Sequence, residues 1–147
     1  MFSIFFTFIN RQAVTDRKLL IIKTTWSYAI AQPEMIGELF YNELFERDPG
    51  LRSMFSDDME QQVRKLTDMI TYMVSRLQAM PEIQTDIDAL AVRHAGYGVR
   101  DAHYATVGKA LLAVLEQRLE EQWDEETRKT WTELYDMWAA SMIKASH

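Results

Sequence analysis

Three histidines, His94, His103 and His147, are the side chains of this 147-residue chain best suited to bind a transition metal. The chain has no cysteine, which excludes disulfides, thiol catalysis and cysteine-ligated zinc or iron–sulfur sites. It also lacks His-Glu-x-x-His and any pair of Glu-x-x-His segments, so a zincin centre and a di-iron carboxylate bundle are excluded. The glycine motifs of phosphate-binding loops and nucleophile elbows are absent as well. What remains is chemistry that a single histidine can perform.

His94 continues an apolar stripe formed by Ile83, Ile87 and Leu90, so its imidazole is expected to point into the core. One interpretation is a core histidine that is satisfied by a single hydrogen bond. The other is the axial ligand of a haem iron, which needs one neutral imidazole in an apolar pocket. In that case the Leu90 carbonyl, one turn earlier, could bind the second ring proton and set the tautomer. His103 lies in a polar run that opens a helix, and we expect it at the surface.

The spacing of apolar residues predicts an all-α fold in which helices must position these side chains. Leu19, Ile22, Trp26 and Ile30 recur at helical intervals, and Pro33 then begins a second helix. No stretch alternates with a period of two for long enough to form a strand. About seven helices of unequal length are predicted, over residues 15–30, 33–47, 51–55, 59–80, 83–94, 102–122 and 124–144.

Length and charge limit the organisation to one acidic domain. A mass of 17.2 kDa is that of a single domain, and a net charge of −6 without a basic cluster excludes binding to nucleic-acid backbones. Phe2 to Ile9 is almost wholly apolar, but it is too short to cross a bilayer and lacks the features of a signal peptide. We therefore divide the chain into an apolar N-terminal extension, 1–14, and a domain, 15–147. The extension is expected to lie against the domain or to pair with a second copy.

Several short motifs follow one another in order from about Thr15 to Ile143, and together they resemble the globin family. Within that family, the motifs resemble those of bacterial single-domain haemoglobins, which are related to the globin part of flavohaemoglobins. This resemblance implies a globin fold of about seven to eight helices around a haem pocket. The motifs are Leu39-Phe40-Tyr41-x-x-Leu44-Phe45, Pro49, Phe55, Gln62-x-Arg64-Lys65-Leu66, Arg93-His94-x-x-Tyr97-Gly98-Val99, His103-Tyr104-x-x-Val107-Gly108 and Trp131-x-x-x-Tyr135.

The resemblance also implies a role for each matching residue. His94 corresponds to the proximal iron ligand, and Tyr41 and Gln62 correspond to the distal polar positions. Phe55 corresponds to the phenylalanine that packs on the haem plane, and Leu66 to the apolar wall beside the gas. Residues that line the proximal side and the haem edge are Leu90, Val99, Tyr104 and Val107. Lys65 and Arg93 lie near the expected haem propionates, although both could equally be solvated surface charges.

A globin of this kind is expected to hold haem b and to bind dioxygen, carbon monoxide and nitric oxide. Because dioxygen in such a pocket carries partial negative charge, donors from Tyr41 and Gln62 predict high oxygen affinity. Glutamine is a poor iron ligand, so a pentacoordinate iron is expected. Alternatives are a nitric oxide dioxygenase served by a separate reductase, since no reductase region follows, and a gas sensor that acts through association.

Two further expectations concern the surroundings of the haem and of the protein. The late glutamate that polarises the proximal histidine in flavohaemoglobins has no counterpart in Lys144-Ala145-Ser146, which argues against peroxidase-like chemistry. We expect a cytoplasmic monomer or homodimer without a nucleic-acid or membrane partner.

Overall fold

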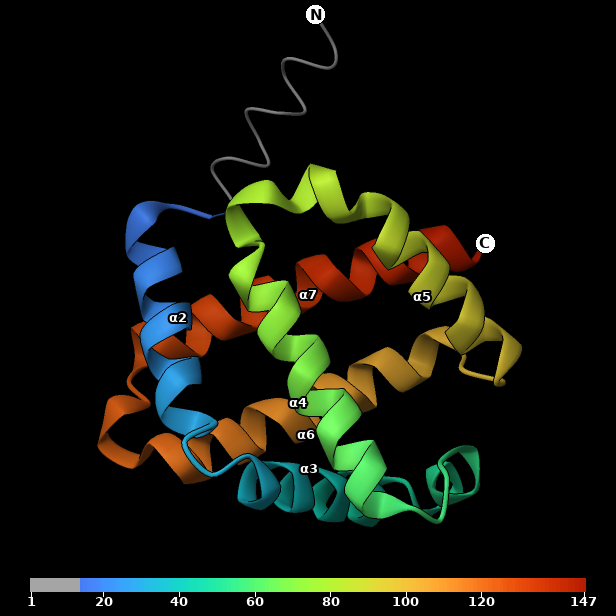
Figure 1. The fold of residues 1–147 in the computed structure, drawn as a ribbon. Helices are drawn as coiled ribbons and strands as arrows, with labels where there is room; N and C mark the ends of the chain where they lie inside the picture. Colours follow the sequence, from blue (N-terminus) through green and yellow to red (C-terminus); the bar gives the residue numbers. More distant parts are fainter. Residues whose placement is uncertain (1–13) are drawn as a thin grey trace, which may run out of the picture.

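The computed structural model describes residues 14–147, and the predicted extension falls outside this range except for Val14. The described residues contain no strand, and none of their helices is long and apolar enough to span a membrane. The all-α prediction is therefore confirmed (Figure 1). The elements are α2 (Asp16–Ala29), α3 (Pro33–Arg47), η1 (Pro49–Met54), α4 (Met59–Ser75), η2 (Leu77–Ile83), α5 (Gln84–Gly96), α6 (Asp101–Leu119), η3 (Glu120–Gln122) and α7 (Glu125–Ser146), where η denotes a 3-10 helix.

Side-chain caps set the first residues of the helices. The Thr15 hydroxyl accepts a hydrogen bond from the Lys18 amide at 3.2 Å and begins α2. Asp58 caps α4 in the same way, since its carboxylate accepts a hydrogen bond from the Gln61 amide at 3.0 Å. Asp124 caps α7 by accepting from the Thr127 amide at 2.8 Å. Pro33 occupies the first turn of α3, where a backbone amide would have no helical acceptor, so the lack of an amide proton costs no hydrogen bond. These starts agree with the predicted ones to within a residue.

The prediction of one continuous helix over 59–80 was wrong beyond Ser75. The helix ends there, and Leu77–Ile83 forms a 3-10 helix that contains Pro81. Proline cannot donate to the carbonyl four residues earlier and its ring clashes with that carbonyl, so the α-helical pattern cannot pass through this segment. Ala79, with φ −126° and ψ 31°, shows that the backbone has already left helical geometry before the proline.

The surface assignment of His103 was also wrong, because its side chain is 9% exposed. His103 is the third residue of α6, and Arg100 is the residue just before this helix. The Nδ1 of His103 accepts a hydrogen bond from the Arg100 amide at 2.9 Å. The imidazole therefore satisfies one of the free amides at the start of a helix, as an acidic capping residue would. The polar sequence around it gave no sign of this local role.

Six α-helices, α2 to α7, enclose the core of the described residues. The main packed pairs are α5 with α7, α3 with α6, α3 with α4, and α6 with α7. Figure 1 shows α4 crossing in front of α6 and α7, while α5 lies to one side. Two tryptophan side chains link helices across the core. Trp131 Nε1 of α7 donates to Thr25 Oγ1 of α2 at 2.9 Å, and Trp26 Nε1 of α2 donates to Thr71 Oγ1 of α4 at 3.0 Å. These two buried indoles thus have the polar partner that burial requires, whereas Trp138 Nε1 is buried without one.

Candidate functional site

A close crossing of α3 and α4 sets the geometry of the distal side. Gly37 on α3 faces Val63 on α4, and a Cβ added at Gly37 would lie 2.2 Å from Val63 Cγ1. Only glycine permits this approach. Tyr41 lies one turn after Gly37 and Gln62 lies next to Val63, so the crossing brings the two predicted distal residues together.

Tyr41 is the buried polar side chain of the distal side, with 4% of its surface exposed. Its hydroxyl donates to the main-chain carbonyl of Gln62 at 3.2 Å, which is long for a hydroxyl donor. Burial raises the pKa of Tyr41 to about 12, so the phenol stays neutral and keeps its proton at ordinary pH. The group is therefore a hydrogen-bond donor with only a weak internal acceptor.

An aromatic cluster fixes the ring of Tyr41 in place. Phe40, Phe45 and Phe55 surround it with ring centroids 5.1, 5.8 and 5.3 Å away, and the contacts with Phe40 and Phe55 are edge-to-face. Phe55 stands at the end of η1 on extended backbone and remains half-buried. The structure thus places the residue expected to cover the haem plane directly against the distal tyrosine.

The other distal residues lie on α4. Gln62 and Leu66 are one helical turn apart and both are half-buried, so each keeps an accessible edge beside Tyr41. Lys65 is exposed on the same helix, and Arg93 is exposed on α5. Their exposure fits contacts with haem propionates and fits solvated surface charges equally well.

His94 lies near the end of α5 and is half-buried. Its Nδ1 is 2.8 Å from the Leu90 carbonyl oxygen, and because a carbonyl can only accept, Nδ1 carries the proton. Burial lowers the pKa of the imidazole, the nearby Arg93 charge lowers it further, and the Leu90 hydrogen bond opposes both. The neutral ring therefore keeps an unprotonated Nε2, which is the form that ligates a metal.

The chain reverses just after His94 at a glycine with positive φ. Gly98 has φ +91°, and the Val99 amide donates back to the His94 carbonyl at 3.0 Å. A Cβ on Gly98 would lie 3.8 Å from Met54 at the end of η1, so this corner also approaches the distal elements. The turn brings half-buried Val99 next to the end of α5.

The predicted proximal wall is formed by half-buried apolar groups on α5 and α6. Leu90, Tyr104 and Val107 all pack against the core while retaining accessible surface. The position of α6 depends on Tyr135 of α7, whose hydroxyl donates to the Tyr104 carbonyl at 2.6 Å. Gly108 admits the Tyr135 ring, since a Cβ there would lie 2.6 Å from Tyr135 Cε2. The motifs contained Tyr135 and Gly108, but their spacing did not reveal this contact.

These residues fit a haem group. The donor set is one neutral imidazole, and residues 14–147 contain no group of three His, Asp or Glu side chains that could hold a bare metal ion. His94 would therefore suit an iron whose remaining ligands come from a macrocycle. In addition, α4 and α5 are not among the main packed helix pairs of the described part of the chain, and Gln62, Leu66, Leu90 and His94 on these two helices are half-buried.

Known proteins show the same fold and a related sequence. The family model described as globin matches residues 38–142. Leghemoglobin 49 of Vicia faba is 25% identical over 142 residues, which cover 89% of this chain and 97% of that protein. A bacterial globin from Campylobacter jejuni superposes with a TM-score of 0.78 at 24% identity, covering 90% of this chain and 96% of the other.

A second similar structure carries a name that refers to enzymatic chemistry. It is an engineered carbene transferase that bears the name of a nitric oxide dioxygenase from Rhodothermus marinus. It superposes with a TM-score of 0.79 at 22% identity, covering 90% of this chain and 93% of the other. Since the family model matches more than half of the chain, this protein belongs to the globin family and is a haem protein that binds diatomic gases.

Proposed function

We propose that this globin binds dioxygen reversibly and with high affinity at a pentacoordinate haem b. His94 is the proximal ligand, and Tyr41 and Gln62 are the distal hydrogen-bond donors. When bound, the haem iron supplies the coordination site for dioxygen, carbon monoxide or nitric oxide. Residues 15–147 form the globin domain, and residues 1–14 are an extension to it.

The observation that carries the proposal is the buried, neutral phenol of Tyr41. Its hydrogen bond to the Gln62 carbonyl is 3.2 Å long, outside the usual range for a hydroxyl donor, so little is lost when the proton turns toward a better acceptor. A diatomic ligand with partial negative charge is such an acceptor. The aromatic cluster holds the ring still during this change, so only the hydroxyl proton has to move.

A main-chain carbonyl holds the His94 imidazole in one orientation. The Leu90 carbonyl fixes both the tautomer and the plane of the imidazole. A carbonyl is a weaker acceptor than a carboxylate, so it polarises the ring only modestly. This arrangement supports reversible gas binding rather than the peroxidase-like chemistry that a carboxylate partner would favour.

Replacing Tyr41 tests the proposal directly. A hydrogen bond to a charged acceptor contributes about 1.5–3 kcal/mol, so Tyr41→Phe is expected to release dioxygen about tenfold to a hundredfold faster. Stopped-flow displacement of dioxygen by carbon monoxide measures this rate. Tyr72→Phe is the matched control, because Tyr72 is an exposed phenol that donates to Asp86 at 2.9 Å on the protein surface. Equal release rates for Tyr41→Phe and the control would remove Tyr41 from the proposal.

A second candidate function is nitric oxide dioxygenase. The similar structure from Rhodothermus marinus bears that name, and the same Tyr41 and Gln62 donors would serve the reaction. We place either activity in a cytoplasmic monomer or homodimer whose haem is reduced by a separate protein. A sensor that signals through association is the third possibility.

A further inference from the structure

A groove of about 260 Å³ lies between α2, η2 and α7, beside the first described residue. Its lining is mostly aliphatic and comes from three segments that are far apart in the sequence. Ile22, Leu77 and Leu134 are buried at its floor, while half-buried Val14 and Met137 lie toward its opening. The apolar residues of this surface, here named the Val14 groove, are Val14, Ile22, Leu77, Leu134 and Met137.

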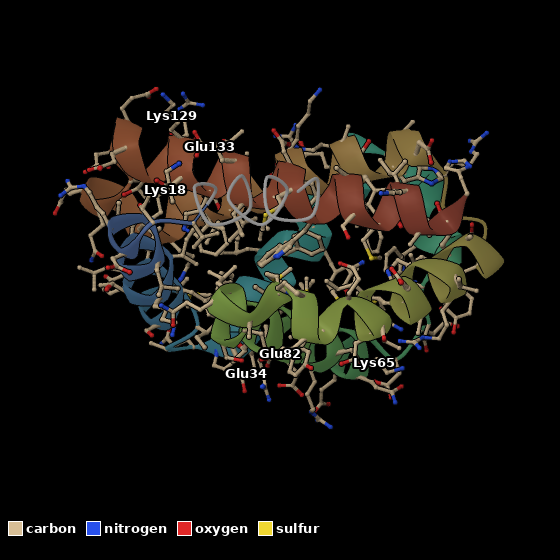
Figure 2. The ribbon with its side chains drawn as sticks, turned by 90° about the horizontal axis from the view of Figure 1, so that it is seen from above. Lys18, Glu34, Lys65, Glu82, Lys129 and Glu133 are labelled. Atoms are coloured by element: carbon tan, nitrogen blue, oxygen red, sulfur yellow. The ribbon has the colours of Figure 1, made fainter. Side chains whose placement is uncertain are left out.

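The polar side chains around the groove already have partners. Lys18 Nζ and Glu133 Oε2 form an ion pair at 2.6 Å, and Figure 2 shows these two side chains close together above α2 and α7. The Thr130 hydroxyl donates to the Glu126 carbonyl at 2.7 Å. The charged side chains at the rim of the groove are therefore paired with each other and do not favour a polar ligand. The buried apolar residues at its floor favour an apolar ligand.

The size of the groove suits an aromatic side chain. An apolar cavity of roughly 150 Å³ accommodates a benzene molecule. The Val14 groove, at about 260 Å³, has room for one phenyl ring with space for a neighbouring aliphatic group. Burying a phenylalanine side chain favours the docked state by about tenfold to a hundredfold, which is enough to hold a tethered segment in place.

We propose that the apolar run Phe2–Ile9 of this same chain occupies the Val14 groove. Val14 is itself part of the lining, so the chain enters the described domain at the groove. Ile9 precedes Val14 by five residues, a distance of at most about 18 Å at roughly 3.6 Å per residue. Phe8 and Phe6 are only slightly further away, which brings aromatic side chains within reach of the opening.

This assignment is independent of the gas-binding function. None of the residues that line the Val14 groove belongs to the distal or proximal sets around Tyr41 and His94. Occupation of the groove would instead join α2 to η2 and α7 on the side where Lys18 meets Glu133. The extension then serves as an internal cover for an apolar surface and not as an assembly or membrane segment.

The absence of native cysteine allows a direct test in the full chain. Thr7→Cys and Phe8→Cys, which point to opposite sides of an extended segment, are each combined with Met137→Cys and treated with an added oxidant. At least one pair is expected to form an intramolecular disulfide about tenfold or more faster than the same cysteine combined with Tyr28→Cys. Tyr28 is an exposed α2 residue outside the groove and serves as the control. Non-reducing electrophoresis separates the cross-linked monomer from a dimer.

A further variant shows whether the apolar side chains cause the docking. Phe6→Ser combined with either Phe8→Ser or Ile9→Ser alters no described residue, so the domain keeps its own core. It is expected to lower the rate of the Thr7–Met137 cross-link at least tenfold. In the chain that keeps Phe6, Phe8 and Ile9, cross-linking of both cysteine pairs no faster than their Tyr28 controls overturns the proposal, and so does a serine variant that cross-links as fast as this chain. A cross-linked dimer also overturns it, because the groove would then take the segment of a second copy.

Discussion

At the scale of single residues, the site depends on two side chains whose protonation is set by burial. His94 is kept neutral with its proton on Nδ1, and Tyr41 is kept as a neutral phenol. The first condition leaves the lone pair that the proposed iron ligation needs, and the second leaves the proton that the proposed hydrogen bond to a gas ligand needs. Both follow from placing ordinary ionisable groups in apolar surroundings.

Removing the proximal imidazole is expected to change the haem spectrum. His94→Ala deletes the nitrogen that the structure aims away from Leu90, so the ferrous Soret band of the wild-type complex should shift or be lost. Optical titration with haemin measures this effect. His147→Ala provides the control, since His147 is exposed and pairs with Asp101 at 3.0 Å. Identical titrations for the two variants would show that His94 does not ligate the iron.

Tyr41 is expected to make the protein sensitive to alkali. Its pKa is about 12 in the folded chain and 10.0 in the unfolded chain, so the unfolded chain loses this proton first as the pH rises. The stability linked to Tyr41 is therefore complete below pH 10 and is lost between pH 10 and about 12, by about 2–3 kcal/mol. Urea unfolding at pH 9 and pH 11.5 should show a smaller pH-dependent loss for Tyr41→Phe. Equal losses in the variant and the wild type would contradict the buried position of the phenol.

At the scale of elements, two glycines bring helices close enough to build the site. Gly37 lets α3 meet α4 one turn before Tyr41, and Gly108 lets α6 meet α7 one turn after Tyr104. In each case a side chain of the partner helix fills the space that a Cβ would occupy. The site tyrosines are therefore positioned by helix crossings as well as by their own contacts.

Adding one methyl group at the α3–α4 crossing is expected to disturb the distal side. Gly37→Ala places a Cβ 2.2 Å from Val63 Cγ1, so the helices must separate at a cost of about 1–3 kcal/mol. Because Tyr41 moves away from Gln62, dioxygen release should also become several-fold faster. Chemical denaturation and stopped-flow release measure the two effects. Gly96→Ala is the control, since no atom lies within 4 Å of its added Cβ. A Gly37 variant as stable as this control would contradict the close crossing.

At the scale of the whole molecule, α4 and α5 pack on different helices, and the two do not form one of the main packed pairs of the described residues. Among residues 14–147, α4 packs mainly on α3 and α5 packs mainly on α7. The distal residues on α4 and the proximal residues on α5 therefore present half-buried edges that a haem can cover. Gas carriage and nitric oxide oxidation would use the same opening, so the fold alone does not separate the two functions.

Turnover with nitric oxide distinguishes these functions. If the protein is a dioxygenase, the haem-loaded wild type supplied with a generic reductase and dioxygen should consume nitric oxide catalytically. Tyr41→Phe should then be slower by about tenfold or more, because it loses a donor of about 1.5–3 kcal/mol. A nitric oxide electrode measures the rates, and Tyr72→Phe again serves as the control. If the wild type and the Tyr41 variant are equally slow, the nitric oxide dioxygenase proposal fails.

Helix periodicity, caps and ordered motifs determined the all-α class, most helix starts and the family from the sequence alone. These features are local or follow chain order, so they can be read without knowing which helices meet. The stripe Ile83, Ile87, Leu90 and His94 likewise pointed the imidazole inward, and the hydrogen bond from His94 to Leu90 was expected because both lie on one helix.

Contacts between distant segments were decided only by the tertiary structure. The sequence did not show that the Tyr41 hydroxyl of α3 turns toward the main-chain carbonyl of Gln62 on α4, or that Gly37 meets Val63 across the same crossing. Two other misses were local: the His103 cap on the Arg100 amide and the end of α4 at Ser75. The sequence also did not reveal the Val14 groove, whose walls come from three separate elements. The physical reason is that packing distances and burial are properties of pairs of helices, and a pattern along one helix carries no information about its partner.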